Sequence, residues 1–134
     1  MNSPDGKYQV EQIDYHEVRM GSPLYGSIKI SGTNMDTSGQ YGETMAFSPD
    51  SRFLAVEELV DTSQGPHTHA VVFEFSRKRK IIVHVQNPGI IRRFSWSPAN
   101  LLTSVTWSLA MGEREYQWQA PTAEPPGLLS KIFS

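Results

Sequence analysis

The sequence predicts an all-β protein, built as an antiparallel meander that folds over itself and contains little helix. Short apolar runs alternate with turn signals along most of the chain, as expected for a series of strands. A Ser-Pro turn recurs at Ser3, Ser48 and Ser97, at intervals of about 45 to 49 residues, the length of one small repeat of strands. Three repeat-like units are therefore expected.

The first unit covers residues 1–42 and holds one predicted hairpin. Residues 7–18 alternate imperfectly between apolar and polar side chains, as in a strand with one face in water. They are expected to pair with residues 24–30 across a short loop that contains glycine and proline. Residues 31–42 contain three glycines and few apolar side chains, so they are expected to form a loop in place of a last strand.

The second unit, residues 43–90, is the most complete. Met45 and Phe47 share one face before the Ser-Pro turn. After the turn, the apolar run at residues 53–56 is nearly continuous, which predicts a strand buried on both faces. Residues 61–68 are expected to form a long loop. Two further strands are predicted, at residues 69–75 and 81–85.

The third unit, residues 91–119, repeats the pattern in a shorter form. Phe94 and Trp96 take the places of the two apolar residues that precede the second Ser-Pro turn. Residues 101–109 and 114–119 are expected to pair as a hairpin.

Two structures are expected near the C-terminus. Because the first unit has no strand before its turn, residues 116–119 are expected to supply that strand and cover an exposed edge. The tail, residues 120–134, begins with prolines and then shows the apolar spacing of a helix of one or two turns. The apolar residues of this helix are Leu128, Leu129, Ile132 and Phe133.

The turns also resemble a known repeat. Residues 47–56 read Phe-Ser-Pro-Asp-Ser-Arg-Phe-Leu-Ala-Val, and residues 96–99 read Trp-Ser-Pro-Ala. With Ser-Pro-Asp-Gly-Lys-Tyr at residues 3–8, they resemble the strand-turn-strand core of TolB-type and WD40-like propeller blades. The resemblance covers most of residues 1–119, but the Trp-Asp signature is absent and Ala99 replaces the aspartate in the last copy.

Repeat number and length together limit the architecture. Three copies are fewer than the four to eight blades that close a propeller, so the expected fold is a partial-propeller-like or two-layer β-sandwich domain. A chain of 134 residues suits one domain with a core that needs no disulfides. A single domain over residues 1–134 is therefore expected.

Composition excludes several classes of protein. The chain has no cysteine, so a disulfide framework or thiolate metal site is impossible, which fits a reducing compartment. It shows neither the apolar core of a signal peptide nor a stretch of about 20 apolar residues, so a cytoplasmic protein without a membrane partner is expected. The formal net charge of −2 provides no general basic field for nucleic acid.

His67 and His69 form a His-x-His pair that suggests a metal site. On an extended chain, positions i and i+2 point to the same side, so both imidazoles could face one ion. A third ligand is required, and no spacing in the sequence places one nearby. The alternative is two polar residues in an exposed loop. We therefore predict no metal and no cofactor.

Glu57, Glu58 and Asp61 form an acidic cluster after the best predicted strand. Three interpretations remain open. The cluster could be a solvated strand end that discourages edge pairing, or a contact surface for a basic partner. Paired carboxylates could also act as general acid and base, but that role requires a fixed separation and a pocket that shifts one pKa.

Residues 77–80 read Arg-Lys-Arg-Lys, and Arg92 and Arg93 add two more cations. The run lies at a predicted turn and has no interleaved aromatic side chains on which bases could stack. Charged turns of this kind favour solubility, so no nucleic-acid partner is predicted.

Neither the Gly-x-Ser-x-Gly elbow nor the phosphate-binding Gly-rich loop occurs in the sequence, so no enzyme is predicted. The tryptophans are expected to pack in the core or between sheets, although one of them could anchor a partner. They are Trp96, Trp107 and Trp118.

A small all-β protein without a catalytic motif is expected to act as a non-catalytic protein-binding module. The role that we favour is a bacterial immunity protein that occludes the active site of a cognate toxin. The alternatives are a small metal- or ligand-binding protein or enzyme that uses His67 and His69, and a scaffold subunit of a larger assembly. The partner site is placed at the end with the longer, more acidic loops, on Glu57, Glu58, Asp61, His67 and Glu113.

Overall fold

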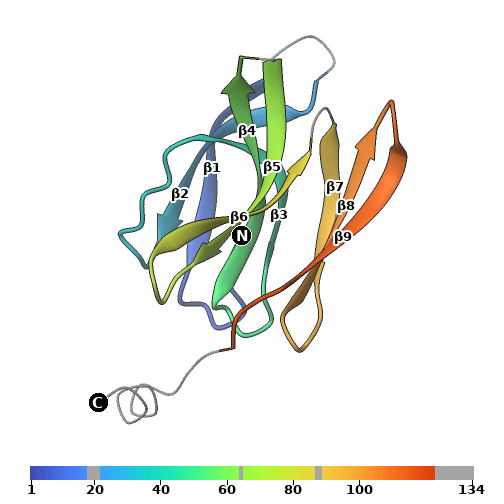
Figure 1. The fold of residues 1–134 in the computed structure, drawn as a ribbon. Helices are drawn as coiled ribbons and strands as arrows, with labels where there is room; N and C mark the ends of the chain where they lie inside the picture. Colours follow the sequence, from blue (N-terminus) through green and yellow to red (C-terminus); the bar gives the residue numbers. More distant parts are fainter. Residues whose placement is uncertain (18–21, 64, 87–88, 123–134) are drawn as a thin grey trace.

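The protein, described by a computed structural model over residues 1–17, 22–63, 65–86 and 89–122, is all-β (Figure 1). Two antiparallel sheets of six and three strands form the fold, and they do not close into a barrel. These residues contain no helix, and so no helical segment that could cross a bilayer. The first sheet contains β1 (Gln9–Glu17), β2 (Leu24–Ser31), β3 (Gln40–Phe47), β4 (Phe53–Thr62), β5 (Gly65–Glu74) and β6 (Arg79–Gln86), and the second contains β7 (Ile90–Trp96), β8 (Leu101–Ser108) and β9 (Gly112–Gln119), each in sequence order.

The six-stranded sheet folds back on itself between β2 and β3, where two residue pairs join the strands. The β1–β2 hairpin thereby covers one face of β3–β6, and Val10 and Ile28 join Leu54 and Phe73 in one core cluster. The β7–β8–β9 sheet covers the opposite face (Figure 1). We call β3–β6 the middle layer, because it has a layer on each side.

Strand β4 runs through this middle layer. Phe53, Leu54, Ala55 and Val56 are each 0% exposed, which confirms the prediction of a strand buried on both faces. Alternate residues of β4 point toward the β1–β2 hairpin and toward the second sheet.

The predicted loop at residues 61–68 is wrong. β4 continues to Thr62 and β5 begins at Gly65, so that Asp61 pairs with Pro66 and Thr62 with Gly65. The local composition favours a loop, but the uninterrupted register of the two neighbouring strands extends the pairing to a tight turn. Gly65 adopts a φ of 104°, which glycine tolerates best.

The expectation that residues 116–119 complete the first repeat is also wrong. They belong to β9, which pairs with β8. The first residues of the chain lie beside β1 instead: Asn2 bridges Gln9, and the Val10 N–H donates to the Met1 carbonyl at 2.8 Å. The predicted helix in the tail lies outside the described residues.

The three Ser-Pro turns share one hydrogen-bond pattern. In each turn, the serine hydroxyl accepts from the backbone N–H of the residue that begins the next run, at 2.9 to 3.0 Å. The serine N–H donates to the carbonyl of that same residue. A left-handed residue, with φ between 59° and 73°, lies two positions before that residue in the first two turns and directly before it in the third. These left-handed residues are Gly6, Ser51 and Asn100.

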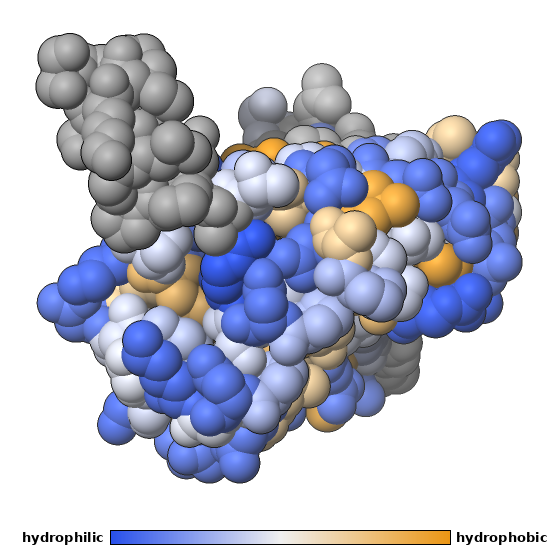
Figure 2. Space-filling model, turned by 90° about the horizontal axis from the view of Figure 1, so that it is seen from below, coloured by the Kyte–Doolittle hydropathy of each residue, from blue (hydrophilic) through white to orange (hydrophobic). Residues whose placement is uncertain are grey.

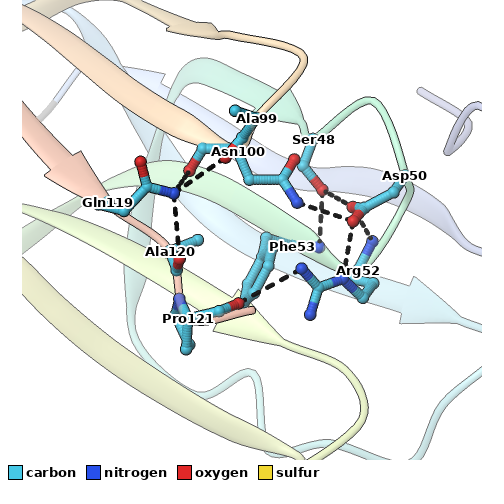
Figure 3. Close-up of polar contacts among 9 residues, drawn as sticks. All are labelled: Ser48, Asp50, Arg52, Phe53, Ala99, Asn100, Gln119, Ala120 and Pro121. Atoms are coloured by element: carbon cyan, nitrogen blue, oxygen red, sulfur yellow. Dashed lines mark hydrogen bonds and ion pairs between the residues drawn. The ribbon is translucent and has the colours of Figure 1, made fainter. Parts of the chain in front are cut away.

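The turns also contact one another. The Asp5 N–H donates to the Ser51 hydroxyl at 3.0 Å. Figure 3 shows the second link, in which the Asn100 amide donates to the Asp50 carboxylate at 2.7 Å. Arg52 links the second turn to the Pro121 carbonyl at 3.3 Å. The three turns are thereby held together at one end of the molecule, and the β4–β5 and β8–β9 hairpin tips lie at the opposite end (Figure 1).

Candidate protein-binding surface

Glu57 lies inside the protein, between the middle layer and the second sheet. It is 2% exposed, and its Oε2 accepts the Ile91 N–H of β7 at 2.6 Å. Tyr25 hydrogen-bonds the same carboxyl group. A Cβ at Gly42 would lie 2.4 Å from Oε1, so glycine leaves the space that this carboxyl group fills. Burial raises the pKa of Glu57 to about 7, even though both hydrogen bonds favour the ionised form.

Glu58 is buried on the opposite face of β4. It is 7% exposed, and its Oε2 accepts from the Lys80 ammonium at 2.8 Å. The Lys80 ammonium also lies 5.7 Å from the centre of the Tyr41 ring. Glu57 and Glu58 are therefore absent from the surface on which they were expected. The reason is that layers cover both faces of β4, so the alternation along the strand exposes neither side chain.

Asp61, His67 and Glu113 lie closer to solvent, at the end where the sequence placed them. Asp61 and Glu113 are exposed, and His67 is partly exposed. Asp61 and His67 come from the β4–β5 hairpin near its tip, and Glu113 follows the β8–β9 turn. Figure 1 shows both hairpin tips at the upper end of the molecule. Their role in partner binding stays a prediction.

The two histidines of the His-x-His pair lie on one strand, β5. His69 is opposite Glu58 and His67 is opposite Val60. The His69 Nδ1 is buried without a hydrogen bond. Across the described ranges, no three His, Asp or Glu side chains gather closely enough to hold a metal ion. The pair thus shows no preformed third ligand, and the absence of metal and cofactor stays a prediction.

Two cations of the basic run at residues 77–80 are neutralised within the first sheet. The Arg79 Nε donates to the Glu74 carboxylate at 2.5 Å, and Lys80 pairs with Glu58. Arg77 and Lys78 are exposed at the β5–β6 turn. Counting only partners in the described part of the chain, the run therefore contributes two unpaired cations rather than a patch of four.

The tryptophans divide into two groups. Trp96 and Trp118 pack around Phe53 between the sheets, with ring centres 5.9 and 6.3 Å from the Phe53 ring. The Trp96 indole also donates to the Ala46 carbonyl at 3.0 Å. Trp107 lies on the opposite side of the second sheet, where the Arg92 guanidinium is 5.4 Å from the indole ring centre.

The β8–β9 turn carries the most exposed large apolar side chain of the described residues. Leu109 is 90% exposed and Met111 is 50% exposed. The Ser108 hydroxyl accepts the Met111 N–H at 3.1 Å, which orders the turn. Sequence reasoning identified the turn but not the exposure of these two side chains. The available signal was the run Leu-Ala-Met directly before Gly112, where a turn usually carries polar residues.

Figure 2 shows the opposite end of the molecule, which carries the Ser-Pro turns. Hydrophilic residues predominate there, and hydrophobic residues are scattered among them.

A pocket of 310 Å³ is lined by β1 and β3 residues and by Met1. Among its lining residues Glu43 is the one ionisable side chain. Catalysis usually requires several ionisable or polar side chains that converge on one reacting atom. The lining residues are Met1, Val10, Gln12, Glu43 and Met45.

Comparison with known protein families, with curated proteins and with solved structures found no match. The resemblance of the Ser-Pro segments to propeller blades therefore stays a prediction.

Proposed function

We propose that this protein is a non-catalytic protein-binding module that contacts its partner through the tip surface, defined as Leu109, Met111, Glu113 and Asp61. The observation that carries the proposal is the exposure of Leu109 and Met111 on an ordered hairpin turn. Large apolar side chains exposed together usually mark a contact with another molecule. Residues of this kind act as anchors when a partner removes them from water.

Charge supports the same surface. Glu113 lies one residue after Gly112 at the β8–β9 turn, and Asp61 lies near the tip of the β4–β5 hairpin at the same end of the molecule (Figure 1). Both are exposed, so the apolar anchors are accompanied by negative charge. Acidic groups at the same end as apolar anchors favour a partner with a basic surface, because complementary charge speeds association and disfavours other partners.

The narrower role that we propose is inhibition of a cognate toxin, as a bacterial immunity protein would perform it. The β8–β9 tip extends to one corner of the molecule (Figure 1). A projecting tip with apolar anchors is suited to enter a concave active site, and occlusion needs no chemistry from the inhibitor.

The first test compares two baits in a pull-down from the native organism's lysate. We expect the unchanged protein to retain one partner protein, in a molar amount equal to its own. The double variant Leu109→Ser, Met111→Ser should weaken that binding by at least about 30-fold, the loss typical of removing an interface anchor. Ile82→Ser is the matched control, because Ile82 is 54% exposed on β6, away from the tip.

Equal retention by the tip variant and the unchanged protein would reject the tip surface. The narrower role is tested on the captured partner after purification. If that partner is a toxic enzyme, adding this protein in equal amount should abolish its activity. An active partner in the complex would reject the inhibitor role while leaving the binding role in place.

A further inference from the structure

The β7–β8–β9 sheet has a second face, directed away from the middle layer, which we call the outer face. Along β8, Leu102 and Thr106 are fully buried toward the middle layer. The alternate residues of β8 therefore point outward. They are Leu101, Thr103 and Trp107, which are partly exposed, and Val105, which neighbouring side chains leave only 2% exposed.

In the β1–β2 layer and in the middle layer, the first residue after the Ser-Pro turn is covered by a neighbouring layer. The first residue after each Ser-Pro turn is Tyr8, Phe53 or Leu101, as the shared hydrogen bond to the serine hydroxyl shows. Tyr8 stacks on Phe75 of the middle layer at 4.0 Å between ring centres, and Phe53 packs against the second sheet. Leu101 begins the same row of positions, and in the described residues no further layer covers it.

Charges flank this row in a regular arrangement. Arg93 pairs with Val105, which in turn pairs with Glu115. At the next outward position of β8, Arg92 lies over the Trp107 ring and Glu113 pairs with Trp107. All four charged side chains are exposed, and they form no ion pair within the described ranges. The outer face thus has a cationic strand, a central strand on which Leu101 and Trp107 are partly exposed, and an anionic strand.

We propose that the outer face binds the outer face of a second copy of this chain, around a two-fold axis parallel to the strands. This axis places β7 of each copy over β9 of the other and preserves position along the strand. Arg93 then meets the partner's Glu115, and the β8 strands lie face to face. The same surface serves both copies, as a two-fold interface requires.

Two other arrangements are less favourable. A two-fold axis perpendicular to the strands places β7 over β7 of the second copy and leaves the opposite charges unpaired. Stacking against the outer side of the β1–β2 hairpin offers a polar surface, because Glu11 pairs there with Lys29 and Gln9 with Ser31. The charge pattern therefore selects the first arrangement.

The outer face is small, so the dimer should be weak. Eight residues of β8 span about 26 Å and three strands span about 14 Å, by ordinary strand spacings. A footprint of about 360 Å² per copy is below the size of standard interfaces, which suits a weak, transient dimer with Kd no tighter than about micromolar.

A charge swap tests this arrangement without altering the tip surface. Sedimentation equilibrium of the full chain, from about 1 to about 500 µM, should show a monomer and dimer in exchange. Arg93→Glu and Glu115→Arg should each raise Kd at least about tenfold, because each variant sets like charges opposite one another. An equal mixture of the two variants should restore the dimer. Glu11→Arg, on the exposed face of the β1–β2 hairpin, is the matched control and should leave Kd unchanged.

Three results would overturn the proposal. The first is a monomer at all concentrations, which would also result if another part of the chain covered the outer face. The second is an equal effect of Glu11→Arg, and the third is a mixture that stays monomeric. Partner capture through Leu109 and Met111 can succeed or fail independently, since Arg93→Glu changes neither residue.

Discussion

Glu57 joins three elements through one carboxyl group. It extends from β4, accepts the N–H of Ile91 on β7 and is hydrogen-bonded by Tyr25 on β2. Removal from water opposes ionisation more strongly than these hydrogen bonds favour it, so the pKa rises from 4.5 to about 7. The protonation of this residue is therefore linked to the stability of the contact between the sheets.

The stability of the protein should decrease as pH rises from about 4.5 to about 7. In this range the folded state keeps a proton on Glu57 that the unfolded state has released. The stabilisation that this proton provides is complete below the pKa of Glu57 in the unfolded protein. It is lost as pH rises through the pKa of Glu57 in the folded protein. A difference of this size corresponds to about 3 kcal/mol in the free energy of unfolding. Urea unfolding at several pH values measures it.

Glu57→Gln provides the control for that measurement. Glutamine keeps the shape and an acceptor for Ile91 but cannot ionise, so the free energy of unfolding should vary by about 3 kcal/mol less between pH 4.5 and pH 7. The assignment to Glu57 is rejected if the variant retains the full pH dependence of the unchanged protein.

The Ser-Pro turn is the element that gives the three layers a common end. Its serine side chain replaces a backbone partner for the first N–H of the following run. In the second turn this serine, Ser48, is 0% exposed and also donates to Asp50 at 2.9 Å. Asp50 in turn accepts from Asn100 of the third turn, so one side chain links the local turn to the packing of the layers.

Replacing Ser48 with alanine should destabilise the protein by about 1 to 3 kcal/mol, because the buried Phe53 N–H loses its partner. Thermal or urea unfolding at constant pH measures this loss. Ser95→Ala is the control, since Ser95 is exposed on β7 and should change stability by at most about 0.5 kcal/mol. Equal stability of both variants would show that the hydroxyl of Ser48 is dispensable.

At the level of the whole molecule, both faces of the middle layer are covered by other strands. Leu54 and Phe73 contact the β1–β2 hairpin, and Phe53 and Val72 contact the second sheet. Loss of either outer layer would expose side chains that are 0% exposed in the folded protein. The layers should therefore unfold together.

Cooperative unfolding is testable with two optical signals. Trp96 and Trp118 lie between the middle layer and the second sheet, so fluorescence reports chiefly on that contact. Far-ultraviolet circular dichroism reports on all strands. We expect the two urea transitions to coincide. A fluorescence change at lower urea would show that the second sheet separates first.

Local sequence information predicted the fold class and most strands. Alternating and continuous apolar runs identify strands because successive side chains point to opposite faces. Serine and proline identify the turns because they satisfy or preset the local backbone. The same reasoning missed the strand residues on either side of the β4–β5 turn, because pairing with a neighbouring strand overrode the composition of residues 61–68.

The sequence by itself thus determined an all-β meander with recurring Ser-Pro turns, since these features depend on neighbouring residues. Only the tertiary structure decided that Glu57 and Glu58 are buried and that Leu109 and Met111 are exposed. The period of a strand gives the alternation of its side chains but not which face another layer covers. That depends on contacts between distant residues, such as Glu57 with Ile91 and Phe53 with Trp96.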